Sequence, residues 1–152
     1  MIGRDDLGFL LAKAAQRWNE LLAERFAAAG WGDVSPSYGS VLVPLLEEDG
    51  LRLGELARRA SLSKQAMTEL VRRLERDELV ERRTDPSDGR ASVVFLTERS
   101  RAFEPVAAQT LAELDGLVRR RLDAGRVDEL RASLKKLLDL GKEDATGKTS
   151  GA

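Results

Sequence analysis

The sequence predicts a mainly α-helical domain with one small β-hairpin. Three observations carry this prediction: apolar residues recur every three or four positions over long stretches, one short stretch is rich in β-branched residues, and 42% of the 152 residues are hydrophobic while 34% are charged. A chain of this length can enclose one hydrophobic core. We therefore expect a single domain over residues 1–140, followed by a disordered tail over 141–152 that is rich in Gly, Thr, Ser and charge.

The first part of the chain is predicted to form two helices. Apolar residues from Leu7 to Phe26 follow a spacing of three and four, which indicates an amphipathic helix of about 25 residues that ends near Gly30. Ser35 and Pro36 then read as the N-cap and first residue of a second helix. Pro44 lies inside that helix and deletes one backbone hydrogen bond, so a bend or an irregular last turn is expected there.

The middle of the chain is predicted to form two short helices in tandem. The first covers residues 53–59, and a tight connection over 60–62 leads to Ser63, which is a good N-cap. The second helix carries its apolar residues on one stripe and ends at about Asp77. Two short helices joined by such a turn form a helix-turn-helix.

A β-hairpin and two further helices are predicted after this pair. The strands cover residues 79–83 and 91–96, and the turn-rich residues 84–90 form a long tip between them. One long helix follows over residues 97–122, and a final helix places apolar residues on one face over 127–138. The hairpin directly after a helix-turn-helix has the position of a wing.

The absence of two residue types excludes several kinds of chemistry. The chain has no Cys and no His, which excludes disulfides, thiol redox sensing, Cys- or His-based zinc sites and nucleophilic triads built on either residue. No other catalytic constellation is present, so we expect no enzymatic activity, no metal and no cofactor. No run of residues resembles a membrane span or a secretory leader, and the expected location is the cytoplasm.

The distribution of charge indicates a basic centre between acidic ends. The net charge of −1 does not by itself suggest nucleic acid, but residues 51–101 hold 12 Lys and Arg against 9 Asp and Glu. Of the 25 basic residues in the chain, 19 are Arg, whose planar guanidinium suits phosphate and guanine.

The second helix of the pair and the hairpin tip carry the candidate DNA contacts. A helical wheel places Gln65 and Arg72 opposite the apolar stripe, where Gln can pair with adenine and Arg with guanine. Taken alone, this face could equally be an ordinary solvated surface. The tip adds Arg90, which can enter a minor groove, with Asp88 expected to brace it through a charge-assisted bond. The full predicted set is Ser61, Ser63, Lys64, Gln65, Thr68, Arg72, Arg73, Asp88 and Arg90.

Three successive stretches of the chain carry a family resemblance: LGELARRASLSKQAMTELVRRLERDELVERR, then DPSDGRA, then VVFLTERSRA. They resemble the helix pair, the wing tip and the entry to the next long helix of the MarR family of winged helix-turn-helix regulators, so the resemblance covers Leu51 to Thr97. The resemblance implies a DNA-binding winged helix over about 34–97 and dimerisation helices over 4–29 and 98–140. It also implies a homodimer that binds a pseudo-palindromic double-stranded DNA site.

The same resemblance implies a repressor released by a small aromatic or anionic effector. Five aromatic residues could line an effector pocket or could equally belong to the core: Trp18, Phe26, Trp31, Tyr38 and Phe103. Glu78 stands where the family usually has Gly, so the recognition helix is expected to end without a left-handed glycine cap. An alternative function is protein–protein interaction without specific DNA binding, which the acidic residues Glu69, Glu75, Asp77 and Glu78 would favour.

Overall fold

The computed structural model describes residues 1–142 of the chain. Residues 1–112 form one compact unit and the residues from 113 on form a second, with the boundary inside helix α5 (Glu98–Leu122). The predicted disordered tail over 141–152 falls outside the described residues from position 143 on. Within the described part, no helix is both long enough and apolar enough to cross a membrane.

Helix α1 covers Leu7–Ala28 and confirms the predicted N-terminal helix. Asp6 caps it, because its carboxylate Oδ1 accepts a hydrogen bond of 3.0 Å from the backbone N–H of Gly8. Gly30 follows the helix with φ +88°, a left-handed conformation that glycine adopts at little cost. The helix therefore ends just before Gly30, as predicted.

The second helix is divided into two parts. Ser35 caps a 3₁₀ turn, Pro36–Tyr38, and α2 follows over Gly39–Glu47. Pro44 lies within α2 and is buried, while Leu46, two residues later, is 36% exposed. The 3₁₀ turn advances the chain by about 120° per residue rather than 100°, so the inward face of α2 is rotated from the one expected for a single α-helix that begins at Pro36.

The helix-turn-helix consists of α3 (Leu53–Arg59) and α4 (Lys64–Arg76), as predicted. Ser61 turns the chain between them with φ +54°, and the backbone N–H of Leu62 donates to the carbonyl of Ala57 at 2.9 Å. Ala66, one of the apolar residues expected on the buried stripe, is exposed in the first turn of α4, before the helix meets the core. The core of this unit contains fully buried side chains from both helices and from the elements around them: Val41, Leu45, Leu56, Met67, Val71, Leu74, Leu79 and Val94.

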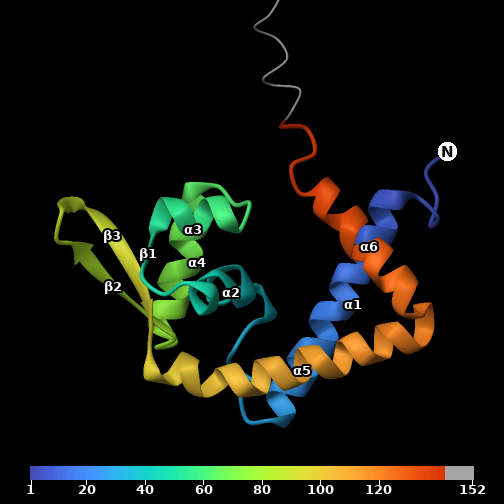
Figure 1. Cartoon of the computed structure of the whole chain (residues 1–152), viewed down its shortest axis with the longest axis horizontal. Helices are drawn as coiled ribbons and strands as arrows, with labels where there is room; N and C mark the ends of the chain where they lie inside the picture. The colour runs from blue at the N-terminus through green and yellow to red at the C-terminus, as the bar shows by residue number, and fades with distance from the viewer. Residues whose placement is uncertain (143–152) are drawn as a thin grey trace, which may run out of the picture. The chain divides into compact units, whose positions relative to one another are not determined.

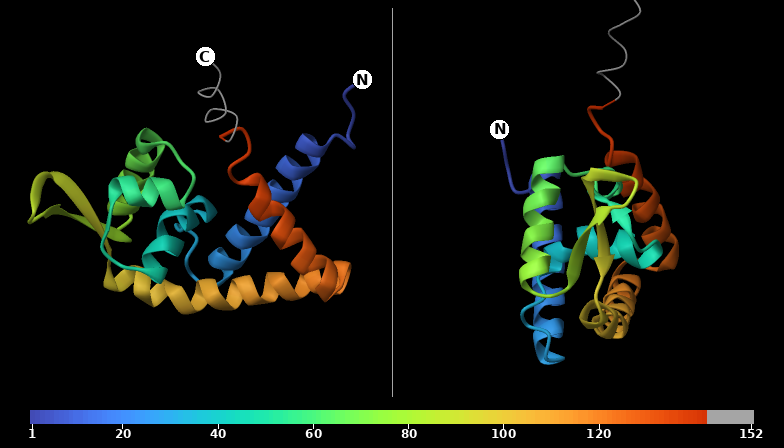
Figure 2. Two further views of the ribbon diagram at one scale, coloured as in Figure 1. Left: turned by 45° about the horizontal axis from the view of Figure 1, so that its top comes forward. Right: turned by 90° about the vertical axis from the view of Figure 1, so that its left-hand side faces the viewer.

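A three-stranded antiparallel sheet supports the hairpin. Strands β2 (Val80–Asp85) and β3 (Asp88–Leu96) form the hairpin, and β1 (Leu51–Arg52), which was not predicted, pairs with β3 on its other edge in the order β1-β3-β2. The tip is shorter than predicted, because pairing continues to Asp85 and Asp88. The hairpin projects beyond α3 and α4 (Figures 1 and 2).

Gly50 allows β1 to lie beside β3. Its φ of +73° is left-handed, and a Cβ atom at this position would lie 2.7 Å from Cε1 of Phe95. A larger residue would therefore be strained in its backbone and would displace the Phe95 ring. The neighbouring Asp49 accepts a 2.9 Å hydrogen bond at Oδ1 from the backbone N–H of Leu96, which joins the end of β3 to the same loop.

The end of α4 is a Schellman motif built on Glu78. Glu78 has φ +59°, its N–H donates to the carbonyl of Glu75 at 3.0 Å, and the N–H of Leu79 donates to the carbonyl of Leu74 at 2.9 Å. The left-handed cap is thus present although the residue is not glycine. A residue with a side chain pays about 1–2 kcal/mol for this conformation. A glycine would avoid that cost, but it would lose more conformational entropy on folding, which would offset part of the gain.

Replacing Glu78 with glycine is expected to stabilise the protein by about 0.5–1 kcal/mol. The free energy of urea unfolding at fixed protein concentration measures this change. Glu69→Gly is the matched control, because Glu69 is exposed in the interior of the same helix, where glycine should destabilise by about 1 kcal/mol. A loss of stability in Glu78→Gly would show that the Glu78 side chain contributes more than its backbone conformation costs.

The unit that begins at residue 113 contains the end of α5 and helix α6, Ala124–Leu137. Asp123 caps α6, because its Oδ1 accepts from the backbone N–H of Arg126 at 3.0 Å. Asp115 lies 2.6 Å from Nε of Arg119 and 3.5 Å from Nη2 of Arg131, which ties the last turns of α5 to α6. Both helices confirm the predicted pair.

Candidate nucleic-acid interface

The outer face of α4 presents polar side chains that have no partner in the structure. Lys64, Gln65 and Arg72 are exposed, while Met67, Val71 and Leu74 on the opposite face are fully buried. Within residues 1–142, no hydrogen bond or ion pair involves any of these three polar side chains. Their donors and acceptors are therefore available to an external ligand.

Hydroxyl groups organise the first turn of α4. The Oγ of Ser63 accepts from the backbone N–H of Ala66 at 3.1 Å, and Oγ1 of Thr68 donates to the carbonyl of Lys64 at 2.8 Å. Each hydroxyl can form a further hydrogen bond: Ser63 can still donate its proton, and Thr68 can still accept at its oxygen. Ser61 is exposed in the turn before the helix. These groups surround a helix N-terminus, where backbone N–H groups and the helix dipole favour an anion.

Tyr38 lies against the end of α4. Its hydroxyl donates to Oδ2 of Asp77 at 2.5 Å, and the guanidinium carbon of Arg73 lies 5.4 Å from the centre of its ring. Burial raises the pKa of Tyr38, and the hydrogen bond to Asp77 raises it further. Arg99 adds a second contact, since its Nη1 donates to the carbonyl of Asp77 at 2.6 Å. The 3₁₀ turn before α2 and the first turn of α5 therefore both contact the C-terminus of α4.

Asp88 and Arg90 lie at the tip of the hairpin, as predicted, but they do not form the expected side-chain pair. Oδ1 of Asp88 accepts from the backbone N–H of Arg90 at 3.0 Å. A carboxylate that bonds the backbone two residues later is the geometry of an Asx turn, which the short tip favours. The Arg90 guanidinium is exposed and makes no ion pair with any residue that the structure describes.

An ion pair between Asp85 and Arg52, which was not predicted from the sequence, stabilises the base of the tip. Asp85 is 9% exposed; its Oδ1 accepts from the backbone N–H of Ser87 at 2.8 Å and from the Ser87 hydroxyl at 2.7 Å. Its Oδ2 accepts from Nε of Arg52 at 2.8 Å, across from β1. The Asp-Pro-Ser order is a recognisable turn signal for Asp85, whereas nothing in the local sequence around Arg52 indicates its partner.

The carboxyl of Asp85 should make the stability of the protein depend on pH in acid. The hydrogen bonds from Ser87, followed by the contact with Arg52, lower the pKa of Asp85 to about 2 from 3.8. A depressed pKa stabilises the folded state above the unfolded value, and this stabilisation is lost as pH falls from about 4 to about 2. Asp85→Asn is expected to be less stable at neutral pH and to lose less stability over that window than the unchanged protein. Urea unfolding at several pH values measures both, and parallel curves for the two proteins would contradict the assignment.

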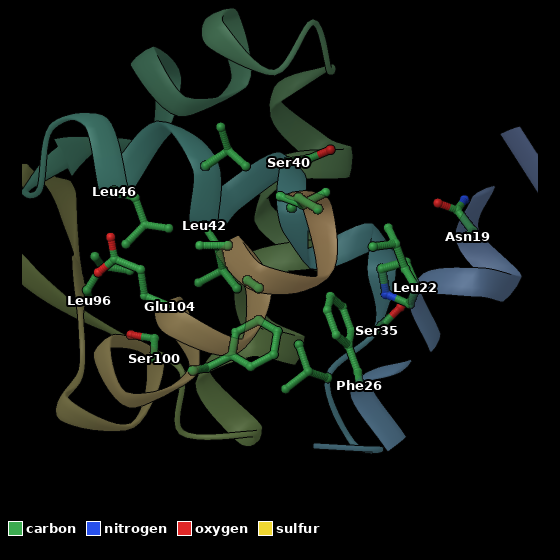
Figure 3. Close-up of a pocket in the computed structure, with 18 of the residues that line it drawn as sticks. Asn19, Leu22, Phe26, Ser35, Ser40, Leu42, Leu46, Leu96, Ser100 and Glu104 are labelled. Atoms are coloured by element: carbon green, nitrogen blue, oxygen red, sulfur yellow. The ribbon is translucent and has the colours of Figure 1, made fainter. Parts of the chain in front are cut away.

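A cavity of about 460 Å³ lies between α1, α2 and the first half of α5 (Figure 3). Three of the five predicted aromatic residues line it, namely Trp18, Phe26 and Phe103. Trp31 is not a lining residue; its ring lies 5.2 Å from that of Phe103 and 5.2 Å from the guanidinium of Arg99. Tyr38 is not one either, because it faces Asp77. The cavity volume is within the range of small-molecule sites.

Most of the lining was not predicted, because it consists of aliphatic and small residues that any core contains. Helix α2 contributes Leu42, Val43 and Leu46, and α5 contributes Ala107, Ala108 and Leu111. Polar groups come from Asn19, Ser35, Ser40, Ser100 and Glu104. The exposure of the apolar lining residues Val43, Leu46 and Leu111 indicates an open apolar site here.

Comparison with known proteins gives a consistent family assignment. The model of the MarR family matches residues 34–92. The HTH-type transcriptional repressor Rv2887 of Mycobacterium tuberculosis is 38% identical over 93 residues, which cover 61% of this chain and 67% of that protein.

Solved structures match nearly the whole chain. A probable transcriptional regulator from Pseudomonas aeruginosa has a TM-score of 0.73 and 28% identity, covering 88% of this chain and 97% of its own. The PcaV transcriptional regulator from Streptomyces coelicolor, solved with its natural ligand, has a TM-score of 0.78 and 21% identity, covering 92% and 97%. At this lower identity the likeness to PcaV shows the fold alone.

Proposed function

The chain belongs to the MarR family of winged helix-turn-helix transcriptional regulators, and from this premise we propose that it is a repressor that binds a specific DNA operator until a small-molecule effector releases it. The observation that carries the proposal is the set of unpartnered polar side chains on α4, Lys64, Gln65 and Arg72, together with an exposed Arg90 at the hairpin tip. Repression is also the activity in the name of the relative from Mycobacterium tuberculosis. We propose no catalytic reaction for the protein. It would act in the cytoplasm, where the chromosome lies.

Helix α4 is proposed to enter the major groove. Gln65 and Arg72 are the base readers, since Gln offers a donor and an acceptor to adenine and Arg two donors to guanine. The remaining contacts go to the backbone: Lys64, Ser61 and Ser63 lie at the helix N-terminus, where phosphate is favoured. Arg73 faces phosphate from the last turn while its guanidinium remains over the Tyr38 ring, and Thr68 adds an acceptor beside the bases.

The hairpin is proposed to act as the wing. Arg90 reaches into the minor groove next to the site of α4, where a narrow groove concentrates negative potential. Asp88 acts by holding the backbone of the turn rather than the guanidinium. The buried Asp85 and its contact with Arg52 keep the tip at a defined place relative to β1 and α3.

We propose that the functional form is a homodimer with its winged helix over about 34–97 and its dimerisation helices over 4–29 and 98–140. Large apolar side chains are exposed on α1 and, separately, on α6, and a second copy would cover them. The residues concerned are Leu7, Phe9, Leu10 and Leu11 on α1, and Leu130, Leu134 and Leu137 on α6. Two copies of α4 would then read half-sites about 34–36 Å apart, one turn of DNA.

The cavity beside α2 is proposed as the effector site. Its lining residues Ser35, Pro36 and Gly39 flank Tyr38, whose hydroxyl is bonded to the end of α4. A ligand that shifts this segment therefore changes the position of α4 and favours a dimer geometry that no longer fits the operator. The structure of PcaV with its natural ligand is consistent with a small-molecule site in a protein of this fold.

Selection of bound sequences from a random duplex library at physiological salt tests the DNA-binding proposal. We expect enrichment of a pseudo-palindrome with half-sites one turn apart, and an affinity that falls steeply with salt because phosphate contacts release counterions. No enrichment by a folded, dimeric protein would contradict the proposal and favour a winged helix used for protein–protein contact.

A further inference from the structure

The cavity beside α2 contains one charged side chain, and that charge is negative. Among the residues that line it in the described part of the chain, Glu104 is the only ionisable one. Glu104 is exposed and makes no hydrogen bond or ion pair with any residue from 1 to 142. Figure 3 shows it on the side of the cavity where Leu46 and Leu96 lie. The carboxylate is therefore at the mouth of an apolar site, without a cation to neutralise it.

The other polar groups of the lining are neutral and do not offset the negative charge of Glu104. Ser100 uses its hydroxyl locally, because its Oγ donates to the carbonyl of Thr97 at 3.0 Å and accepts from the Thr97 N–H at 3.0 Å. The Oγ of Ser35 is 2.8 Å from that of Ser37. Ser40 and Asn19 remain as neutral hydrogen-bonding groups. None of these can compensate the charge of an anionic ligand.

The arginines nearest to Glu104 along α5 are held outside the cavity. Arg101 places Nη2 2.7 Å from Oδ2 of Asp49. Arg99 bonds the carbonyl of Asp77, pairs with Asp33 and lies over the Trp31 ring. Neither residue lines the cavity. An anionic effector, which the family resemblance suggested, would meet no basic side chain from residues 1–142 in the cavity lining and would be repelled by Glu104.

We propose that the cavity takes a small apolar ligand that carries one positive charge, an amine on an aromatic or aliphatic body, with Glu104 as its counter-ion. The inference rests on the effector site of the proposed function and specifies its ligand class. The apolar body would lie against Trp18, Phe26 and Phe103, and the ammonium group would donate to the Glu104 carboxylate at the mouth. Charge-assisted hydrogen bonds of this kind are stronger than neutral ones.

Three probes that share one body and differ in charge test the ligand class: 3-phenylpropylamine, 3-phenylpropanol and 3-phenylpropanoate. Their dissociation constants are measured by calorimetry and by the fluorescence of Trp18 in a Trp31→Phe background, which leaves one tryptophan in the cavity wall. We expect the amine to bind about ten-fold or more tightly than the carboxylate, with the alcohol between them. Carboxylate binding equal to or tighter than amine binding would overturn the proposal, as would no binding of any probe up to about 10 mM.

Two variants locate the charge that selects the ligand. Glu104→Gln should weaken the amine about ten-fold and strengthen the carboxylate, because the repulsion is removed. Glu98→Gln is the matched control: Glu98 is exposed on the same helix but does not line the cavity, so the order and affinities should stay unchanged. An unchanged order in Glu104→Gln would overturn the role of Glu104. Operator binding of the same preparations without ligand is measured in parallel, so that a failed ligand prediction with intact DNA binding contradicts this inference alone.

Discussion

Replacing Arg72 with alanine is expected to relax the specificity of operator binding at one base pair in each half-site. Arg72 is exposed on the outer face of α4 without a partner among the described residues, and a bidentate contact between Arg and guanine discriminates against other bases by about 1–3 kcal/mol. The variant should therefore lose most of its affinity for the preferred operator, while operators altered at that base pair should bind it nearly as they bind the original protein. Competition binding against single-base operator variants at constant salt measures the difference.

Two further variants separate base reading from general charge. Arg72→Lys keeps the charge but loses the planar pair of donors, so it should also lose discrimination at that position. Arg121→Ala removes an exposed arginine from the end of α5, outside the proposed interface, and should leave specificity unchanged. An equal loss of affinity for all operator variants in Arg72→Ala would contradict the base-reading role and would indicate a phosphate contact instead.

Arg90→Ala is expected to weaken binding to every DNA sequence and to reduce its salt dependence. The guanidinium at the hairpin tip has no ion-pair partner within residues 1–142, so its charge is available to the electronegative minor groove. Loss of one such contact should lower the slope of log K against log salt by about 0.9, which corresponds to about a five-fold loss of affinity near physiological salt. Binding measured across a salt series gives both quantities.

The lysine variant at the same position is the control for charge. Arg90→Lys should restore most of the salt dependence, because the positive charge is kept, but Lys fits a narrow groove less well than Arg. A preference for A·T pairs beside the half-site should therefore weaken in Arg90→Lys. An unchanged salt slope in Arg90→Ala would show that the tip does not contact DNA.

The elements formed by local signals could be predicted from the sequence to within a few residues. The helix pair was predicted with its observed ends, because the Ser63 hydroxyl caps α4 through a partner only three residues away. Helix α1 was predicted in the same way from its apolar spacing and Gly30. Amphipathic period, caps and glycine stops act within one helical turn, so they can be read without knowledge of the fold.

The hairpin and the left-handed cap could be predicted only in part. The strands were expected, but the length of the tip depends on Asp85, whose buried carboxylate bonds Arg52 from 33 positions earlier. Glu78 was expected to remove the left-handed cap, yet the backbone adopts that conformation. Burial of Leu79 and the hydrogen bond from the Thr97 hydroxyl to the carbonyl of Glu78, at 2.7 Å, stabilise it from outside the helix.

The fold class, the order of the elements and the polar face that α4 presents follow from residue type and spacing, so they could be predicted before the structure was known. What each apolar or charged side chain faces depends on contacts between distant parts of the chain. Tyr38 contacts α4 rather than the cavity, and Arg99 and Arg101 pair with Asp33 and Asp49. Among the described residues that line the cavity, Glu104 is the one that carries a charge. The physical reason is that periodicity identifies the inward side of a helix, whereas the partner on that side comes from another part of the chain.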